Sequence, residues 1–182
     1  VNAQMMRQIL NGEIGQMNAR FDTEQSFLTY LRNINGKTAA IFSLACQEGA
    51  YFSEADRRQV ALAKRIGQNI GLSFQMLDDI LDYSDGKNLN KPVMEDLATG
   101  VYSLPLLMVL QEHKAELMPY LAKKEQMTAA DMEAVKQLVL KYGGVTKAKA
   151  LAEKFIQKAL DQTSQLPASQ KRDLLEKLIK RL

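Results

Sequence analysis

The chain has 182 residues with 46% hydrophobic content, which suffices for one sizeable core and favours a single domain over residues 1–182. Its formal net charge of +3 is small and its basic residues are scattered, which excludes the concentrated basic surface typical of nucleic-acid-binding proteins. A single cysteine excludes an internal disulfide and favours a reducing, cytoplasmic location.

The composition and the apolar pattern favour an all-α protein, built as an antiparallel helical assembly, because prolines are few and apolar residues recur at helical spacing. The expected helices cover about residues 1–17, 27–31, 37–50, 54–83, 128–142, 145–163 and 168–182, while residues 97–110 are an apolar segment interrupted by Gly100 and Pro105. A turn is expected at Asn33, Asn35 and Gly36, and Ser53 is expected to cap the long helix that follows. The longest apolar run, residues 104–110, is far shorter than the roughly 20 residues that cross a bilayer, so no transmembrane segment is expected.

The end of the long predicted helix gathers polar groups on one side. At about 100° per residue, Gln75, Asp78, Asp79 and Asp82 fall within an arc about 100° wide, and Gly71 lies on the same stripe one turn earlier. The other side is expected to be buried, and it carries Phe74, Met76, Leu77, Ile80 and Leu81. We therefore expect the carboxylates to converge on one direction, with room at Gly71 for a ligand to approach.

Negative charge is unfavourable at this position of a helix. The C-terminal end already carries partial negative charge, so each anion there costs a few tenths to about 1 kcal/mol, and neighbouring carboxylates also repel each other. A solvated acidic helix end is the simpler interpretation. The sharper one is a hard divalent cation that neutralises the cluster, and all-oxygen ligands favour Mg²⁺ held between carboxylates and a phosphorylated substrate.

Two other metal sites do not fit the sequence. A calcium-binding EF-hand loop needs glycine at its sixth position, whereas Gly86 is fifth in a loop that begins at Asp82. Zinc is equally disfavoured because the only histidine is His113 and the only cysteine is Cys46. We expect His113 to be a solvated surface residue and Cys46 to be a small core residue.

Cations that would complete a phosphate site lie near the acidic stripe. Lys87 and Lys91 follow it in a polar loop. Lys37 and Thr38 come directly after Gly36, at an expected helix start where backbone N–H groups also receive anions. Each lysine alone is an ordinary surface charge, and only their combination with the acidic stripe indicates a phosphate site.

These segments together resemble the trans-isoprenyl diphosphate synthases, the polyprenyl synthetase family. The segment GLSFQMLDDILDY (71–83) resembles the family's second aspartate-rich motif, F-Q-x-x-D-D-x-x-D, and KTAAIFSLACQEGA (37–50) resembles its Lys-Thr helix. Further matches are Gly12-Glu13 with Gln16, Lys91-Pro92, Asp96-Leu97, GVYSLP (100–105) and Gly143-Gly144. The resemblance covers essentially the whole chain in order, and it implies the fold of the class I isoprenoid synthases.

The resemblance implies Mg²⁺-dependent head-to-tail transfer of an allylic diphosphate to isopentenyl diphosphate, with Mg²⁺ as cofactor. By motif match, Asp78 is the leading metal ligand, and Asp79 and Asp82 hold metal-bound water or complete the cluster. The residues implied to contact the allylic diphosphate are Lys37, Thr38, Gln75 and Lys91, while Lys87 is at most an electrostatic helper. Asp78, Asp79 and Lys37 are the candidate catalytic residues.

The chain departs from the family pattern in several places. Asn90 replaces a glycine before the loop lysine, Val101 replaces the lysine of G-K-x-T-L-P, and Ser103 replaces its threonine. The first aspartate-rich motif and the basic segment that binds isopentenyl diphosphate are not among the 182 residues, and Val1 already lies in a helical pattern. We therefore expect a C-terminal portion whose N-terminal helices are missing and which alone does not turn over substrate. Apolar faces left uncovered by the missing helices favour a homodimer or a heteromer.

Two alternatives stay open at this stage. One is another class I terpenoid enzyme, such as a terpene cyclase. The other is a regulatory or structural helical subunit of a heteromeric synthase, which the intact Asp78, Asp79 and Asp82 disfavour and the replacement at Val101 leaves open.

Overall fold

The computed structural model describes residues 2–83 and 94–182, and within these ranges it contains helices and no strand, which confirms the all-α fold class. The first half holds α1 (Asn2–Asn18), α2 (Phe27–Ile34), the π-helical segment η1 (Asn35–Ala39), α3 (Ala40–Phe52) and α4 (Arg57–Leu81). The second half holds α5 (Glu95–Ala98), α6 (Leu104–Leu110), α7 (Lys114–Leu121), η3 (Lys124–Gln126), α8 (Ala129–Lys141), α9 (Gly144–Thr163) and α10 (Gln170–Ile179).

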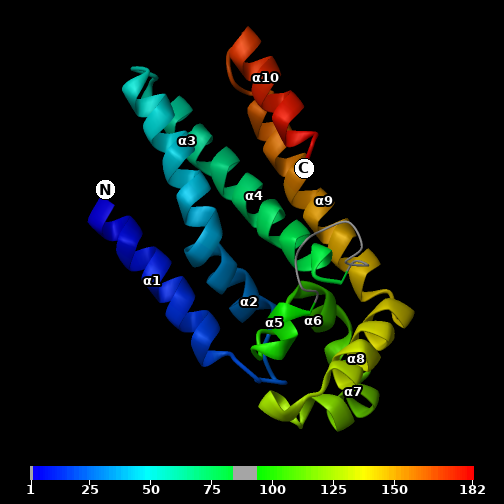
Figure 1. Cartoon of the computed structure of the whole chain (residues 1–182). Helices are drawn as coiled ribbons and strands as arrows, with labels where there is room; N and C mark the ends of the chain where they lie inside the picture. The colour runs from blue at the N-terminus through cyan, green and yellow to red at the C-terminus, as the bar shows by residue number, and fades with distance from the viewer. Residues whose placement is uncertain (1, 84–93) are drawn as a thin grey trace.

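The long helices lie side by side, and the short ones gather at one end of the molecule (Figure 1). The helix α4 packs against α3 on one side and against α9 on the other, while α1 packs against η1. The short helices α5 to α8 lie near the C-terminal end of α4 (Figure 1). The acidic stripe therefore lies where the long helices meet the short ones.

The expected turn at Asn33, Asn35 and Gly36 is wrong, because the chain stays helical from α2 through η1 into α3. Helix α1 crosses at this point, and a Cβ added to Gly12 would lie 2.4 Å from the backbone nitrogen of Lys37. Gly12 and Gly36 thus let two backbones touch. One wider π-helical stretch keeps the chain helical past this contact, and such stretches often occur at functional sites.

Capping residues and glycines determine where the helices begin and end. Helix α4 begins after Asp56 and not after Ser53, because the Asp56 side chain accepts from the backbone N–H of Gln59 at 2.8 Å. Gly100, at φ +80°, interrupts the apolar segment 97–110 as expected and separates α5 from α6. The short helix α7 was not predicted.

The core holds the end of α4 in place from two sides. Leu72 and Met76 of α4 are buried with Tyr30, Ile34, Ala39, Leu104 and residues of α9 in one cluster. Tyr83 belongs to a second cluster under α5 to α8. Met76 is fully buried, and emptying such a core position costs about 2–5 kcal/mol, so the acidic turn stands on a rigid base.

Not every residue of the expected apolar side is buried. Phe74 is 45% exposed and Leu81 is 49% exposed, so the expectation is wrong for both. At the start of the chain, α1 exposes a stripe of Met6, Leu10, Ile14 and Met17. Among the described residues, no helix is long and apolar enough to cross a membrane.

Candidate functional site

The three aspartates of the acidic stripe have three different surroundings. Asp78 is exposed, Asp82 is partly buried, and Asp79 is only 3% exposed. The expectation that all three converge on one open face is therefore wrong for Asp79. The reason lies in helix geometry, since Asp79 follows Leu72 by two turns and Met76 by three residues, and both of those are buried.

Asp79 is held inside the molecule by donors from three elements. The Tyr30 hydroxyl donates to Asp79 Oδ2 at 2.7 Å, and the backbone N–H of Leu104 donates to the same oxygen at 3.0 Å. Gln75 Nε2 donates to Oδ1 at 3.0 Å. Burial raises the pKa of Asp79 to about 6, although these donors act in the opposite direction by stabilising the carboxylate.

Gln75 connects the acidic turn to η1. Its amide oxygen accepts from the Thr38 hydroxyl at 2.7 Å, and its Nε2 also lies 3.5 Å from Asp78 Oδ2. The structure thus brings Thr38, Gln75, Asp78 and Asp79 together in one hydrogen-bonded chain, as expected from the sequence for residues that share a site.

Asp82 closes α4 and anchors the start of α5. Its backbone oxygen accepts from the N–H of Met94 at 3.3 Å, and its Oδ1 accepts from the N–H of Glu95 at 3.2 Å. Burial raises the pKa of its carboxyl group. Its other oxygen, Oδ2, is buried and has no hydrogen-bond partner among the residues that the structure describes. An orphaned carboxylate oxygen is costly, and a bound cation or water would remove that cost.

Lys37 lies beside the stripe, but not at a helix start. Its Nζ donates to Gln16 Oε1 at 2.8 Å and lies 3.2 Å from Glu13 Oε2 in an ion pair. Because the helix runs continuously through η1, the expectation of free backbone N–H groups at Lys37 is wrong. The lysine itself is 38% exposed in its side chain, so it can still reach an anion.

The expectations for the loop lysines, Gly71 and Ser103 have different outcomes. Lys87, Asn90 and Lys91 lie outside the described residues. Gly71 leaves no room for a ligand, because a Cβ there would lie 2.5 Å from Ala39 Cα, so the expected approach route is taken by η1. Ser103 is buried and hydrogen-bonds the hydroxyl of Tyr83.

Cys46 and His113 have ordinary structural surroundings. Cys46 is partly buried, and burial raises the pKa of its thiol, which disfavours the reactive thiolate. His113 was expected to be solvated, but its ring stacks on the Tyr142 ring with centroids 3.5 Å apart. The correction follows from tertiary packing of α8 near the start of α7, which the local sequence does not show.

The carboxylates fit the metal that the sequence implies only in part. Among residues 2–83 and 94–182, no group of three His, Cys, Asp or Glu side chains is arranged to hold a metal ion. Asp78 and Asp82, four residues apart on α4, still offer oxygen ligands on one face, and the orphaned Asp82 Oδ2 needs a partner. Two carboxylates suit Mg²⁺, which keeps several waters and takes further ligands from phosphate. Asp79 does not fit this role, because both of its oxygens are engaged.

Sequence reasoning missed the roles of three residues of this site. Tyr30 and the backbone of Leu104 hold Asp79, and Glu13 pairs with Lys37. One signal was available for the first two: the register of Asp79 with Leu72 and Met76 indicates that this carboxylate points inward and needs donors.

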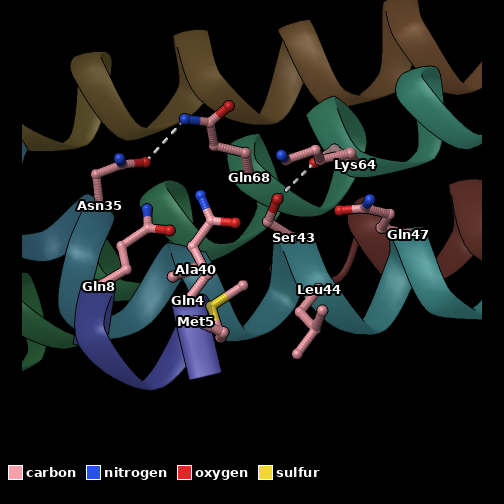
Figure 2. A pocket seen from close by; sticks show the side chains of 10 residues that line it. All are labelled: Gln4, Met5, Gln8, Asn35, Ala40, Ser43, Leu44, Gln47, Lys64 and Gln68. Carbon is pink, nitrogen blue, oxygen red and sulfur yellow. Dashed lines mark hydrogen bonds between the residues drawn. The ribbon is translucent and has the colours of Figure 1, made fainter. Parts of the chain in front are cut away.

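A cavity with a volume of about 460 Å³ lies elsewhere, between α1, α3 and α4 (Figure 2). Its walls are rich in side-chain amides, including Gln4, Gln8, Gln47 and Gln68, and Gln68 donates to Asn35 at 2.8 Å. None of the acidic residues lines it. The cavity is therefore separate from the candidate site.

The chain was compared with known proteins. A family model described as polyprenyl synthetase matches residues 1–142. Heptaprenyl diphosphate synthase component 2 of Bacillus subtilis is 32% identical over 98% of the chain, which covers 51% of that protein. Decaprenyl-diphosphate synthase of Dictyostelium discoideum is 31% identical over 93% of the chain, which covers 37% of that protein.

The chain is also similar to solved structures of prenyl diphosphate synthases. Geranylgeranyl pyrophosphate synthase from Lactobacillus brevis matches with a TM-score of 0.92 and 41% identity, over 98% of this chain and 56% of that one. Heptaprenyl diphosphate synthase from Staphylococcus aureus matches with a TM-score of 0.89 and 34% identity, over 98% of this chain and 57% of that one. The chain spans about half the length of most of these relatives.

Proposed function

Because the chain belongs to the polyprenyl synthetase family, we propose that it carries the part of a trans-isoprenyl diphosphate synthase that binds Mg²⁺ and the allylic diphosphate. The reaction would be head-to-tail transfer of the allylic group to isopentenyl diphosphate, which makes a longer prenyl diphosphate. The observation that carries the proposal is the continuous hydrogen-bonded chain from Thr38 through Gln75 to Asp78, directly beside Lys37.

The metal ligands that we propose are Asp78 and Asp82. Asp78 is exposed, and Asp82 has a buried oxygen that finds no partner in the described ranges 2–83 and 94–182. Mg²⁺, when bound, would stabilise the negative charge that develops on the departing diphosphate and would hold its oxygens in place. Asp79 supports these two residues from inside the core and is not proposed as a ligand.

Lys37, Thr38 and Lys91 would bind the diphosphate of the allylic substrate. During the reaction the bond between the allylic carbon and the diphosphate oxygen breaks, and its electron pair leaves with the diphosphate. The double bond of isopentenyl diphosphate then forms the new carbon–carbon bond, and loss of a proton from the isopentenyl part gives the double bond of the product. Lys37 is placed to stabilise that growing negative charge. It must first exchange its contact with Glu13, which is a part-exposed ion pair and costs at most about 1 kcal/mol to give up.

Apolar side chains lie one turn away from the ionic groups. Phe74 precedes Asp78 by four residues on α4 and is 45% exposed, and Ile41 follows Lys37 by four residues and is 53% exposed. Side chains four apart lie on the same helix face. We propose that they form part of the wall along the prenyl tail, which keeps water from the allylic cation until the double bond of isopentenyl diphosphate attacks it.

A second candidate is a subunit of a two-component synthase. Two relatives carry the name heptaprenyl diphosphate synthase component 2, from Bacillus subtilis and Geobacillus stearothermophilus. In this case the chain would work only with a second, different subunit, whereas the first candidate is part of a synthase that needs no different subunit. The location would be the cytoplasm in either case, although some relatives are named as mitochondrial or chloroplastic.

Calorimetric titration of the chain with inorganic diphosphate, with and without Mg²⁺, tests the proposed site. We expect binding that needs Mg²⁺ and that Asp78→Ala abolishes. Asp161→Ala, which removes an exposed carboxylate from α9, is the matched control and should bind as the wild type does. Binding that persists in Asp78→Ala, or that does not need the metal, would refute the site.

A further inference from the structure

Tyr30 is a buried residue of α2 that no sequence motif singled out; only 4% of its surface is exposed. Its hydroxyl donates to Asp79 Oδ2 at 2.7 Å, across 49 positions of the sequence. The backbone N–H of Leu104, at the start of α6, donates to the same oxygen at 3.0 Å. Donors from two separate elements thus converge on one oxygen and hold the Asp79 side chain away from the exposed face of α4.

The other oxygen of Asp79 sets the orientation of the Gln75 amide. Gln75 Nε2 donates to Asp79 Oδ1 at 3.0 Å, and an ionised carboxylate can only accept. The NH₂ group of Gln75 must therefore face Asp79. Its amide oxygen then faces η1, where it accepts from the Thr38 hydroxyl at 2.7 Å.

We propose that Tyr30 is a positioning residue for the face that binds metal and diphosphate, and that it acts through Asp79 on Gln75 and Thr38. This inference rests on the proposed function, which supplies the ligand for that face. It assigns Asp79 to holding the hydrogen-bonded chain in place, because both of its oxygens already accept from this protein's own groups. Outer partners of this kind keep the residues around a metal oriented.

The test compares two tyrosine-to-phenylalanine variants. Tyr30→Phe removes the hydroxyl that holds Asp79. Tyr102→Phe is the matched control, because Tyr102 is 1% exposed and its hydroxyl has no hydrogen-bond partner in the described part of the chain. This variant therefore removes a buried hydroxyl that positions none of the described residues. Circular dichroism confirms that each variant is folded, which separates positioning from loss of structure.

The readout is Mn²⁺ binding in the presence of inorganic diphosphate, measured from the electron paramagnetic resonance signal of free Mn²⁺. We expect Tyr30→Phe to weaken Mn²⁺ binding about tenfold, and Tyr102→Phe to change it less than about twofold. Equal affinities in the two variants would overturn the inference and leave the proposed function intact. Failure of the wild type to bind, or full binding by Asp78→Ala, would overturn the proposed function and the inference with it.

If Tyr30→Phe does not fold, Asp79→Asn tests the positioning role instead. Asparagine can keep its oxygen toward Tyr30 and Leu104, which turns its NH₂ group toward Gln75. The Gln75 amide must then reverse, so that its NH₂ group faces the Thr38 hydroxyl. We expect this variant to bind Mn²⁺ about tenfold more weakly and to shift the side-chain amide signals of Gln75 in NMR spectra. Unchanged Mn²⁺ affinity in Asp79→Asn would overturn the inference.

Discussion

At the residue scale, identical side chains acquire different roles from their register on one helix. Asp78 faces outward, Asp79 faces into the core, and Asp82 ends α4 and anchors α5. A carboxylate that leaves water needs donors, and Tyr30 with Leu104 supplies them to Asp79. In the acidic stripe, Asp78 and Asp82 are therefore the proposed metal ligands, and Asp79 supports them from the core.

The contact between Lys37 and Glu13 gives a prediction at this scale. Lys37→Met should weaken Mg²⁺-dependent diphosphate binding at least about tenfold, because a charge-assisted hydrogen bond is lost. Glu13→Gln should change the affinity less than about fivefold, because the part-exposed ion pair with Lys37 is weak. Calorimetric titration measures both. A larger loss in Glu13→Gln than in Lys37→Met would contradict the assignment of Lys37 to the diphosphate.

Sequence reasoning reached the outward residues and missed the inward support. Thr38, Gln75 and Asp78 were identified from their pattern, and the structure brings them together. Tyr30 was missed because its contact with Asp79 spans 49 positions and depends on how α2 packs on α4. No local pattern carries that information.

At the element scale, glycines decide how closely the helices approach. A Cβ on Gly71 would lie 2.5 Å from Ala39 Cα, and a Cβ on Gly67 would lie 2.3 Å from the backbone oxygen of Phe42. These contacts seat α4 against η1 and α3, and so set the distance between Gln75 and Thr38. The turn expected at Asn33 to Gly36 was wrong for the same reason: glycine signalled close packing there, and not a break.

Two glycine-to-alanine substitutions test this packing. Gly71→Ala should lower the free energy of unfolding by about 1–3 kcal/mol, because backbone atoms must move apart. Gly49→Ala, in α3, meets nothing within 4 Å and should raise it by about 0.5–1 kcal/mol through better helix propensity. Urea denaturation measures both changes, and a destabilisation by Gly49→Ala equal to that of Gly71→Ala would contradict the account.

The cap at the start of α8 gives a pH prediction. Asp131 accepts from Thr128 and from Lys123, and its pKa is lowered to about 2, chiefly by the hydrogen bond from Lys123. A lowered pKa in the folded state stabilises the fold above the unfolded value near 4, and this contribution is lost as the pH falls toward 2. The wild type should therefore lose stability relative to Asp131→Asn between about pH 4 and pH 2. The measurement is the free energy of unfolding of both proteins as a function of pH. If it changes with pH in the same way for the wild type and for Asp131→Asn, the prediction is wrong.

At the scale of the whole molecule, the all-α class and most long helices were predicted from composition and periodicity. The short helices were not, because α5, α6 and α7 depend on Gly100 and on packing around a shared core and not on a long apolar stripe. The exposed stripe of α1, Met6, Leu10, Ile14 and Met17, agrees with the expectation of an uncovered apolar face.

That stripe predicts association. We expect sedimentation velocity to show the chain as a dimer or larger at micromolar concentration, and Leu10→Glu to shift it toward monomer because a charge would be buried in the contact. Leu140→Glu, at the only large exposed hydrophobic residue described in α8, should not. A wild-type chain that stays monomeric would contradict the prediction.

Turnover gives a second prediction at this scale. The chain alone should not incorporate isopentenyl diphosphate into a longer product, because it spans about half the length of its relatives and the family's first aspartate-rich motif is not among its 182 residues. An assay with radiolabelled isopentenyl diphosphate measures this, and robust incorporation would refute it.

The central claim is that Asp78 and Asp82 hold a divalent cation that binds a diphosphate. The most direct measurement is anomalous scattering from crystals of the chain grown with Mn²⁺ and inorganic diphosphate. We predict an anomalous peak about 2.1 Å from a carboxylate oxygen of Asp78, shared with Asp82 directly or through water, while Asp79 remains bonded to Tyr30. A bound diphosphate without metal at Asp78, or a metal held by Asp79, would contradict the account.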